Sequence, residues 1–314
     1  MQIRQASLDD TQAISQLFVG KVERWQRMNA AGQVEDLPYE QLNIYERWLH
    51  GGAWLSIETG AVWLSHLLGG AGVPIVLLED HAIRGYAEYF ISQEPAPFHR
   101  HLHIRRLVAD LDADQAIYDH LVTYLLEQAQ KIGRITVAST SYDHDTLRFY
   151  EGYGFSPIHE IQQYTVPTQS GNVGFYKVSA HPTGSSSQIQ GWLMPIGRTE
   201  SARFHWEELW PALWHGVPKI IERTLHRQHI NAAGQEAYVC SQQQLYDPRN
   251  AEIYCWTPKP MSAQLMSAIR DWAHKVGYRT LTLTISEKLV PLLGSQAEKR
   301  PYQQTILAYN GSHQ

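Results

Sequence analysis

The chain has 314 residues, of which 43% are hydrophobic and 18% are charged. This composition supplies enough apolar material for packed cores, and the length exceeds the usual size of one core, so the sequence predicts two domains. A formal net charge of −5 at pH 7 disfavours binding to nucleic acids. The first ten residues lack the apolar core of a signal peptide, and no later stretch is as long as an apolar membrane span. We therefore expect a soluble, cytoplasmic protein with no nucleic-acid or membrane partner.

The two cysteines, Cys240 and Cys255, indicate neither a metal site nor a redox site. Their separation matches no paired zinc-ligand spacing and no redox dithiol. We expect two reduced, partly buried thiols, and a structural disulfide is the alternative.

The first 72 residues begin with a strand and a helix. Residues 2–6 can form a short strand, and Ser7 with Asp10 three residues later is a helix-start signal before apolar positions. Residues 30–72 are rich in Gly, Trp and Leu, and they predict helical pieces whose ends the pattern does not define.

The sequence up to residue 168 follows the pattern of one α/β domain. After residue 73 the sequence predicts strands over 74–80 and 83–91, a strand over 100–109, an amphipathic helix over 115–131, a strand over 134–140, a short helix over 143–150 and a strand over 158–166. Asp143 is the expected cap of the short helix, and Gly152 and Gly154 end it. We expect the first domain to span residues 1–168.

A second domain is expected after a turn-rich connection. Residues 169–190 contain Pro, Gly and the run Ser185 to Ser187, a composition that is typical of a linker. Beyond it the sequence predicts a strand over 192–196, a Trp-rich helix capped by Thr199, a hairpin around Gly234, a strand over 251–256, a helix over 262–275 and a strand over 278–285. The second domain is expected to span residues 191–314.

Two short matching segments support a duplication. Residues 129–133 read AQKIG and residues 273–277 read AHKVG, and each lies between a predicted helix and the strand that follows it. Because the match falls at the same junction in each half, the sequence predicts tandem repeats.

Residues 141–155, SYDHDTLRFYEGYGF, resemble the signature of the GNAT superfamily of N-acetyltransferases, in which a short helix ends in Phe-Tyr-Glu and a Gly-Phe turn. The segment follows a strand and a long helix and precedes a final strand, in the order that this superfamily uses. The second half resembles the fold only in the order of its elements. The resemblance implies an α/β (α+β) protein of two tandem GNAT-like domains, each with a mixed central sheet flanked by helices.

The resemblance also implies a site for acetyl-CoA as co-substrate. The strands over 105–109 and 134–140 would splay apart and admit the pantetheine arm of the cofactor, whose amides would bond to exposed backbone groups. In the superfamily a glycine-rich loop and the helix N-terminus after it hold the pyrophosphate. The cofactor-binding residues expected on this basis are Leu107, Val108, Ala109, Gln115, Ala116 and Asp143.

The phosphate-binding loop of this sequence departs from the superfamily pattern. Residues 111–116 contain no glycine and no arginine, and they place Asp112 and Asp114 where a diphosphate would lie. Like charges repel, and side chains block the close approach that glycine allows, although an acid at a helix start also favours the helix dipole. The corresponding residues 257–262 of the second half also lack glycine and carry two prolines, so we assign no chemistry to that half.

Two residues are candidates for acid and base roles. Tyr150 occupies the position where the resemblance places a phenol that protonates the departing thiolate. Its alternative is a tyrosine that packs at a helix end. Glu88 is the candidate proton acceptor, because alternation puts it on one strand face with Tyr86, and its alternative is a solvated outer residue.

Histidine and tryptophan clusters complete the set of candidate residues. His99, His101 and His103 alternate along a strand and would share one face. Because no carboxylate or cysteine lies at a matching spacing, we favour a polar strand face over a zinc site and expect no metal. The tryptophans in residues 192–214 predict core or interdomain packing, with an aromatic acceptor pocket between domains as the alternative.

The sequence leads to one hypothesis and two rivals. The hypothesis is an acetyl-CoA-dependent N-acetyltransferase that acts on a small amine by direct transfer, with Tyr150 as general acid. The first rival is a catalytically degenerate protein of the same fold that binds a ligand or partner without acyl transfer, which the missing glycines favour. The second rival, a structural dimerisation module, has no positive signal in the sequence.

Overall fold

The computed structural model describes residues 1–29, 31–170, 176–181, 184–214, 217 and 225–309. Contacts divide the chain into two compact units that are interleaved along the sequence. Unit 1 comprises residues 1–90, 104–131 and 212–222, and unit 2 comprises residues 91–103, 132–211 and 223–314. This division differs from the sequential one. The boundaries 1–168, 169–190 and 191–314 therefore stay a prediction about the repeats.

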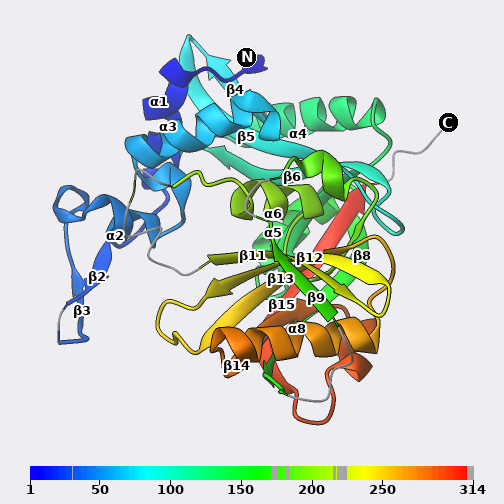
Figure 1. Cartoon of the computed structure of the whole chain (residues 1–314). Coiled ribbons are helices and arrows are strands. Elements are labelled where there is room, and N and C mark those ends of the chain that lie inside the picture. The colour runs from blue at the N-terminus through cyan, green and yellow to red at the C-terminus, as the bar shows by residue number, and fades with distance from the viewer. Residues whose placement is uncertain (30, 171–175, 182–183, 215–216, 218–224, 310–314) are drawn as a thin grey trace. The chain divides into compact units, whose positions relative to one another are not determined.

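Unit 1 consists of a β-sheet and the helices that accompany it (Figure 1). Its elements are β1 (Gln2–Gln5), η1 (Leu8–Asp10), α1 (Thr11–Val19), β2 (Gln26–Met28), β3 (Val34–Asp36), η2 (Tyr39–Gln41), α2 (Ile44–Trp48), η3 (Ala53–Leu55), α3 (Ile57–His66), the π-helical turn η4 (Leu67–Ala71), β4 (Val73–Glu79) and α4 (Gln115–Gln130). The strands β5 (Ala82–Gln93) and β6 (Arg100–Ala109) contribute residues to both units. The sheet order is β1-β4-β5-β6.

Local signals explain where the elements of unit 1 begin. Ser7 and Asp10 form the capping box that the sequence predicts, and the Asp10 carboxylate also pairs with Arg4. Residues 30–72 hold the strand β3, which pairs with β2 just before this segment, in addition to helical pieces, so the helical expectation for this segment is only partly right. Ser56 begins α3 by accepting a hydrogen bond from Thr59 N.

Unit 2 contains the larger part of the sheet. Its elements are β7 (Ile135–Thr140), α5 (His144–Gly152), β8 (Ser156–Pro167), β9 (Tyr176–Ala180), η5 (Ser186–Ile189), β10 (Leu193–Ile196), α6 (Ala202–Leu209), β11 (Leu225–Ala232), β12 (Gln235–Gln243), β13 (Asn250–Thr257), α8 (Ala263–Val276), β14 (Thr280–Ile285), η6 (Glu287–Leu292) and β15 (Glu298–Tyr309). The order is β7-β15-β8-β14-β13-β12-β11-β9, with β10 on β13. Parallel and antiparallel pairs both occur, which confirms the expected mixed sheet.

The last strand of the chain lies between two strands of the first half. β15 is antiparallel to β7, with Leu307 opposite Val137, and it is antiparallel to β8, with Gln304 opposite Ile161. β8 in turn pairs with β14 of the second half, where Leu283 lies opposite Tyr164. The two sequence halves therefore exchange their final strands, and each final strand is flanked by strands from the other half.

Two details of the second half differ from the sequence prediction. The expected linker over 169–190 contains β9, which pairs with β11, and the turn η5. Ser201 rather than Thr199 caps α6, because its side chain accepts from Phe204 N. The Ser201 hydroxyl lies directly before the first helical turn, where the free N–H groups need acceptors.

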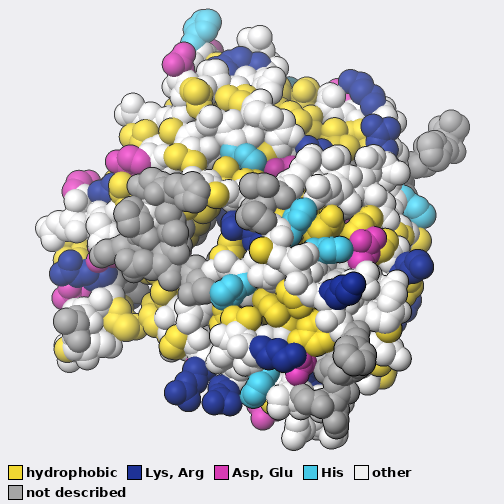
Figure 2. Space-filling model, in the orientation of Figure 1, with side chains coloured by type: hydrophobic (Ala, Val, Ile, Leu, Met, Phe, Trp, Pro, Cys, Tyr) yellow, Lys and Arg dark blue, Asp and Glu magenta, His cyan; other side chains and the backbone are white. Residues whose placement is uncertain are grey.

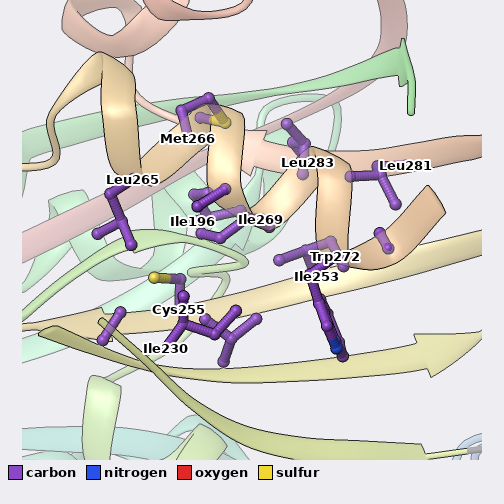
Figure 3. Packing of buried hydrophobic residues seen from close by; sticks show 14 of the residues in the cluster. Ile196, Ile230, Ile253, Cys255, Leu265, Met266, Ile269, Trp272, Leu281 and Leu283 are labelled. Carbon is purple, nitrogen blue, oxygen red and sulfur yellow. The ribbon is translucent and has the colours of Figure 1, made fainter. Parts of the chain in front are cut away.

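The main core of unit 2 lies between α8 and the sheet. α8 turns Leu265, Met266, Ile269 and Trp272 toward the strands, and Ile253, Cys255, Leu281 and Leu283 meet them there (Figure 3). The spacing of three and four residues puts the α8 side chains on one face. Ser262 caps α8, and Gly277 ends it with a φ of 112°.

The two cysteines lie on opposite faces of neighbouring strands. Val239 of β12 is opposite Cys255 of β13, so Cys240 and Cys255 are offset by one residue and point to different faces. Cys255 packs under α8, whereas Cys240 packs with the tryptophans of α6. Both thiols are free, and they are fully rather than partly buried.

Within the part of the chain that the structure describes, no helix combines the length and the apolar character that a membrane span needs. Basic and acidic side chains are interspersed on the face that Figure 2 shows.

Candidate functional site

Glu88 on β5 is the centre of a buried hydrogen-bonded group in unit 1. Its side chain is only 2% exposed. Three donors converge on its oxygen Oε2, namely Trp54 Nε1 at 3.1 Å, Trp63 Nε1 at 3.0 Å and the Tyr86 hydroxyl at 2.8 Å. The predicted alternation of Tyr86 and Glu88 on one strand face is therefore correct. The alternative of a solvated outer glutamate is wrong, because the two indoles and the phenol shield the carboxylate.

Burial governs the chemistry of the aromatic partners of Glu88. Burial, with an added contribution from the Glu88 carboxylate, raises the pKa of Tyr86 well above its usual value. The phenol therefore stays protonated at neutral pH and acts as a donor. Trp54 also stacks on Phe18 of α1 at 5.8 Å between ring centroids. Sequence reasoning missed both tryptophans, because they lie in the segment whose element boundaries the pattern did not define.

The loop between β6 and α4 is acidic, as the sequence indicates. Arg84 Nη1 pairs with Asp110 Oδ2 at 2.8 Å, and Arg84 Nε lies 3.8 Å from Glu79 Oε2. Asp112 and Asp114 are exposed. Asp114 is the N-cap of α4 by backbone geometry, but its side chain makes no capping hydrogen bond.

The residues that the resemblance assigns to the cofactor occupy both units. Val108 and Ala109 are buried at the end of β6, Leu107 is half-buried, and Gln115 and Ala116 form the first turn of α4, all in unit 1. Gln115 Nε2 donates to Asp119 Oδ1 at 3.1 Å. The start of β6 is joined to the residue before β7 by a hydrogen bond from Leu102 N to Arg134 O.

The helix α5 is built as the sequence predicts. Asp143 caps it, because its side-chain oxygens accept from Thr146 N at 3.0 Å and from the Thr146 hydroxyl at 2.7 Å. Tyr150 is 6% exposed. Its ring contacts Phe149 and Phe155 in edge-to-face arrangements with centroid distances of 5.0 and 5.3 Å. Tyr150 and Asp143 belong to unit 2, whereas Glu88 belongs to unit 1.

In the second half, the chain itself occupies the fork that corresponds by element order to the expected acetyl-CoA cleft. The parallel strands β13 and β14 pair only over Asn250–Glu252 and Thr280–Thr282. Beyond that point β13 pairs with β10, and Gly197 N donates to Thr284 O at 2.8 Å. Residues 193–197 therefore lie between the diverging strands. A slender cofactor arm would have to displace this segment, which agrees with assigning no chemistry to the second half.

Gly197 fits this fork because it has no side chain. Its φ is +83°, and a Cβ atom at this position would lie 2.5 Å from Ile253 O and 2.8 Å from the Cα of Tyr254. Both contacts are with backbone, which cannot rotate away.

The histidines form a buried charged cluster in unit 2 and not a polar strand face. His99 is exposed, whereas His101 and His103 are each 1% exposed. His103 Nε2 lies 2.7 Å from Glu200 Oε2, and His101 Nε2 lies 3.8 Å from Glu94 Oε1. Local spacing does not indicate Glu200 as a partner of His103, because the two residues lie 97 positions apart. Among the described residues, no group of three or more His, Cys, Asp or Glu side chains could hold a metal ion.

Glu94 is the acceptor that holds this cluster together. Its carboxylate pairs with the Arg198 guanidinium and accepts from Ala202 N and the Ser92 hydroxyl. Burial alone would raise the pKa of Glu94, but Arg198 and His101 hold it below its usual value. Burial lowers the pKa of His101 to about 4. Near neutral pH the ion pair between Glu94 and Arg198 therefore has a neutral His101 beside it.

The tryptophans of α6 are core residues. Trp206 and Trp210 are fully buried and stack with a centroid distance of 4.1 Å, and Trp256 meets both edge-on. Trp192 packs against the same cluster. Trp214 lies in unit 1, where its ring contacts Trp48 at 4.4 Å. Of the expected core or interdomain packing, core packing is correct for Trp206 and Trp210.

No family model and no curated protein sequence matches this chain. Solved structures match it at low identity. A GCN5-related N-acetyltransferase from Anabaena variabilis is 14% identical, with a TM-score of 0.57 and coverage of 98% of this chain and 72% of that chain. A GCN5-related N-acetyltransferase from Kribbella flavida is 10% identical, with a TM-score of 0.57 and coverage of 98% and 71%. The chain has the GNAT fold.

This GNAT fold confirms the resemblance that residues 141–155 indicated. It extends over both sequence halves, since both of these structures cover 98% of the chain. At these identities the likeness is one of fold, and the chemistry has to be argued from the residues.

Proposed function

We propose that the protein is an acetyl-CoA-dependent N-acetyltransferase that acts on a small amine, with its site in the first half of the chain. The observation that carries the proposal is Tyr150, which the Asp143-capped helix α5 presents directly after β7 within the signature segment. The GNAT fold of the whole chain supports it. The closed fork between β13 and β14 favours the first half over the second as the site.

The residues around the β6–α4 junction fit an acyl-CoA with low affinity. Ala109 ends β6, and α4 begins without a side-chain cap, so first-turn amides and the helix dipole face outward as they would toward a pyrophosphate. Asp112 and Asp114 oppose an anion there, but both are exposed and water screens their charge. The backbone donors thus raise the affinity for a pyrophosphate, whereas the nearby acids lower it.

The proton transfers of the reaction are assigned to two side chains. Acetyl-CoA supplies an acetyl group activated as a thioester. Tyr150 carries a phenolic proton that it donates to the leaving sulfur, and the phenol is reset from solvent. Glu88 accepts the proton that the attacking amine must lose, and Trp54 and Trp63 hold its carboxylate in place.

Calorimetric titration with acetyl-CoA tests the cofactor. We expect a dissociation constant in the range of about 0.1–1 mM. Neutralising both acids in Asp112→Asn with Asp114→Asn should tighten binding severalfold, because two repulsive charges are removed. Absence of heat at millimolar acetyl-CoA for both proteins would exclude the transferase.

Turnover of a panel of small amines tests the acid. Tyr150→Phe should slow acetyl transfer about 100-fold and leave acetyl-CoA binding unchanged, since only the phenolic oxygen is lost. Tyr153→Phe, at the end of the same helix, is the matched control. Equal turnover of the two variants would remove Tyr150 from the acid role.

A second candidate function is binding of a ligand or partner without acyl transfer. The ion pair between Arg84 and Asp110 favours it, because this arginine at the acidic loop already neutralises a carboxylate of the protein. In that case acetyl-CoA should give no heat, and Tyr150→Phe should have no functional effect.

A further inference from the structure

A cavity of about 360 Å³ lies within unit 2, and no residue that lines it has a role in the proposed transfer reaction. The end of β5, the start of β6, the turn η5 with its flanking residues, and α6 enclose it. Its cationic groups come from Arg100 and Arg203, and its hydroxyl groups come from Ser92, Ser185, Ser186 and Ser187. The serine run that reads as a linker in the sequence is thus one wall of a built cavity.

The charge of the cavity is positive. No acidic side chain is among the described residues that line it. Arg100 is exposed, and in the described part of the chain its guanidinium makes no ion pair and no side-chain hydrogen bond. Arg203 is held in place, because Nη1 donates to Ile91 O at 3.1 Å and Nε lies 3.7 Å from Glu207 Oε1. One guanidinium is therefore anchored and the other can close on a ligand.

The serine wall presents hydrogen-bond donors. Ser185 Oγ accepts from both Ser187 N and the Ser187 hydroxyl, at 3.3 and 3.0 Å. Its lone pairs are then occupied, so its own hydrogen is left to donate. Ser186 adds a second hydroxyl. An excess of donors over acceptors suits an oxyanion.

The cavity walls are fixed to each other before any ligand binds. Gln190 Nε2 donates to Gln93 Oε1 at 3.0 Å, and Gly191 N donates to Gln93 O at 2.8 Å. These bonds tie the end of η5 to the end of β5. Because the donors are already held in position, less conformational entropy is lost on binding.

We propose that this cavity binds a small phosphomonoester through its phosphate group. The donors come from β6, the serine wall and α6, and a tetrahedral group with three oxygens can meet donors from several directions, whereas a planar carboxylate meets them in one plane. The volume exceeds that of a phosphate ion, and Ile91 and Ile189 line the remaining space. The phosphate contacts Arg100, Arg203 and the serine hydroxyls, and the carbon body packs against the two isoleucines.

Calorimetry on the full chain with four probes tests this proposal. Glycerol 3-phosphate should bind with a dissociation constant below about 1 mM, inorganic phosphate several times more weakly, and acetate and glycerol not detectably at about 10 mM. A higher salt concentration should weaken the binding of both glycerol 3-phosphate and inorganic phosphate, because salt screens the attraction between the arginines and the phosphate group. No binding of glycerol 3-phosphate, or equal binding of acetate, overturns the proposal.

Variants locate the binding. Arg100→Gln should weaken glycerol 3-phosphate about tenfold, and Ser186→Ala should weaken it a fewfold. Both side chains lie at the cavity surface, so the fold should be retained, which circular dichroism checks. Arg27→Gln, an exposed arginine of unit 1 that pairs with Glu35, is the matched control. If Arg100→Gln and Arg27→Gln bind the ligand equally, the phosphate does not lie in this cavity.

Discussion

Glu88 gathers two indoles and a phenol on a single carboxylate oxygen, so it has a structural role whatever its part in proton transfer. The alternation of β5 predicts its pairing with Tyr86. Trp54 and Trp63 were not predictable as partners, because they come from η3 and α3, more than twenty residues earlier. Local periodicity carries no information on which distant donors meet a strand face.

Removing the Glu88 carboxylate should destabilise unit 1. Glu88→Ala leaves three buried donors without an acceptor, and we expect the free energy of unfolding to fall by about 3 kcal/mol or more. Glu58→Ala, at an exposed position of α3, is the control and should change it by less than about 0.5 kcal/mol. Urea denaturation measures both, and a similar small effect for the two variants would contradict the hydrogen-bonded role.

The buried His101 should make stability depend on pH. Its pKa is about 4 in the folded protein, against an ordinary 6.5. Between these values the unfolded chain binds more protons, so the free energy of unfolding falls as pH is lowered from 7 to 4, by about 3 kcal/mol. The lowered pKa of Glu94 acts in the same direction at the acid end.

Denaturation of His101→Gln between pH 4 and 7 should show a flatter dependence. His120→Gln, at an exposed position of α4, should keep the dependence of the original protein. Identical curves for the two variants would mean that His101 is not the titrating group.

At the scale of elements, the fork between β13 and β14 depends on one residue without a side chain. Gly197→Ala should lower the free energy of unfolding by about 3 kcal/mol or more, because a Cβ would meet backbone atoms of Ile253 and Tyr254. Gly191→Ala is the control. It has a similar φ of +79° but no atom within 4 Å of the added Cβ, so only the backbone cost of about 1 kcal/mol applies.

Thermal unfolding of the two glycine variants separates steric closure from backbone strain. If both variants lose the same stability, the fork has room for a side chain at Gly197. In that case the second half could also admit a slender ligand.

Most elements were predictable from sequence, and their pairing was not. Apolar runs, caps and glycines predicted the bounds of β4 to β8, α4, α5, α8, β13 and β14 to within a few residues. β9 was missed because its short, polar, exposed sequence in a turn-rich segment has no strand pattern. The position of β15 was missed for a different reason. Its pairing with β7 joins residues more than 160 positions apart, and such contacts leave no local signal.

At the scale of the whole molecule, the exchange of β8 and β15 should couple the two sequence halves. Leu307→Asp places a charge at a fully buried position of β15 and should lower the free energy of unfolding by about 3 kcal/mol or more. Protection from hydrogen exchange should fall in β7 and also in β13 and β14, because the strands form one sheet.

Lys299→Asp, at the exposed start of the same strand, is the control and should leave exchange unchanged. If Leu307→Asp raised exchange only in β7 and β8, the two halves would unfold independently in spite of their shared strands.

The two buried cysteines can report when the sheet around them opens. Burial raises the pKa of the Cys240 thiol to about 12, and that of Cys255 is also raised, so neither forms a thiolate near neutral pH. A maleimide or disulfide reagent would therefore label the folded chain only when the strands separate. Because one thiol lies under α8 and the other beside α6, the order in which they become labelled would reveal which face of the sheet loosens first.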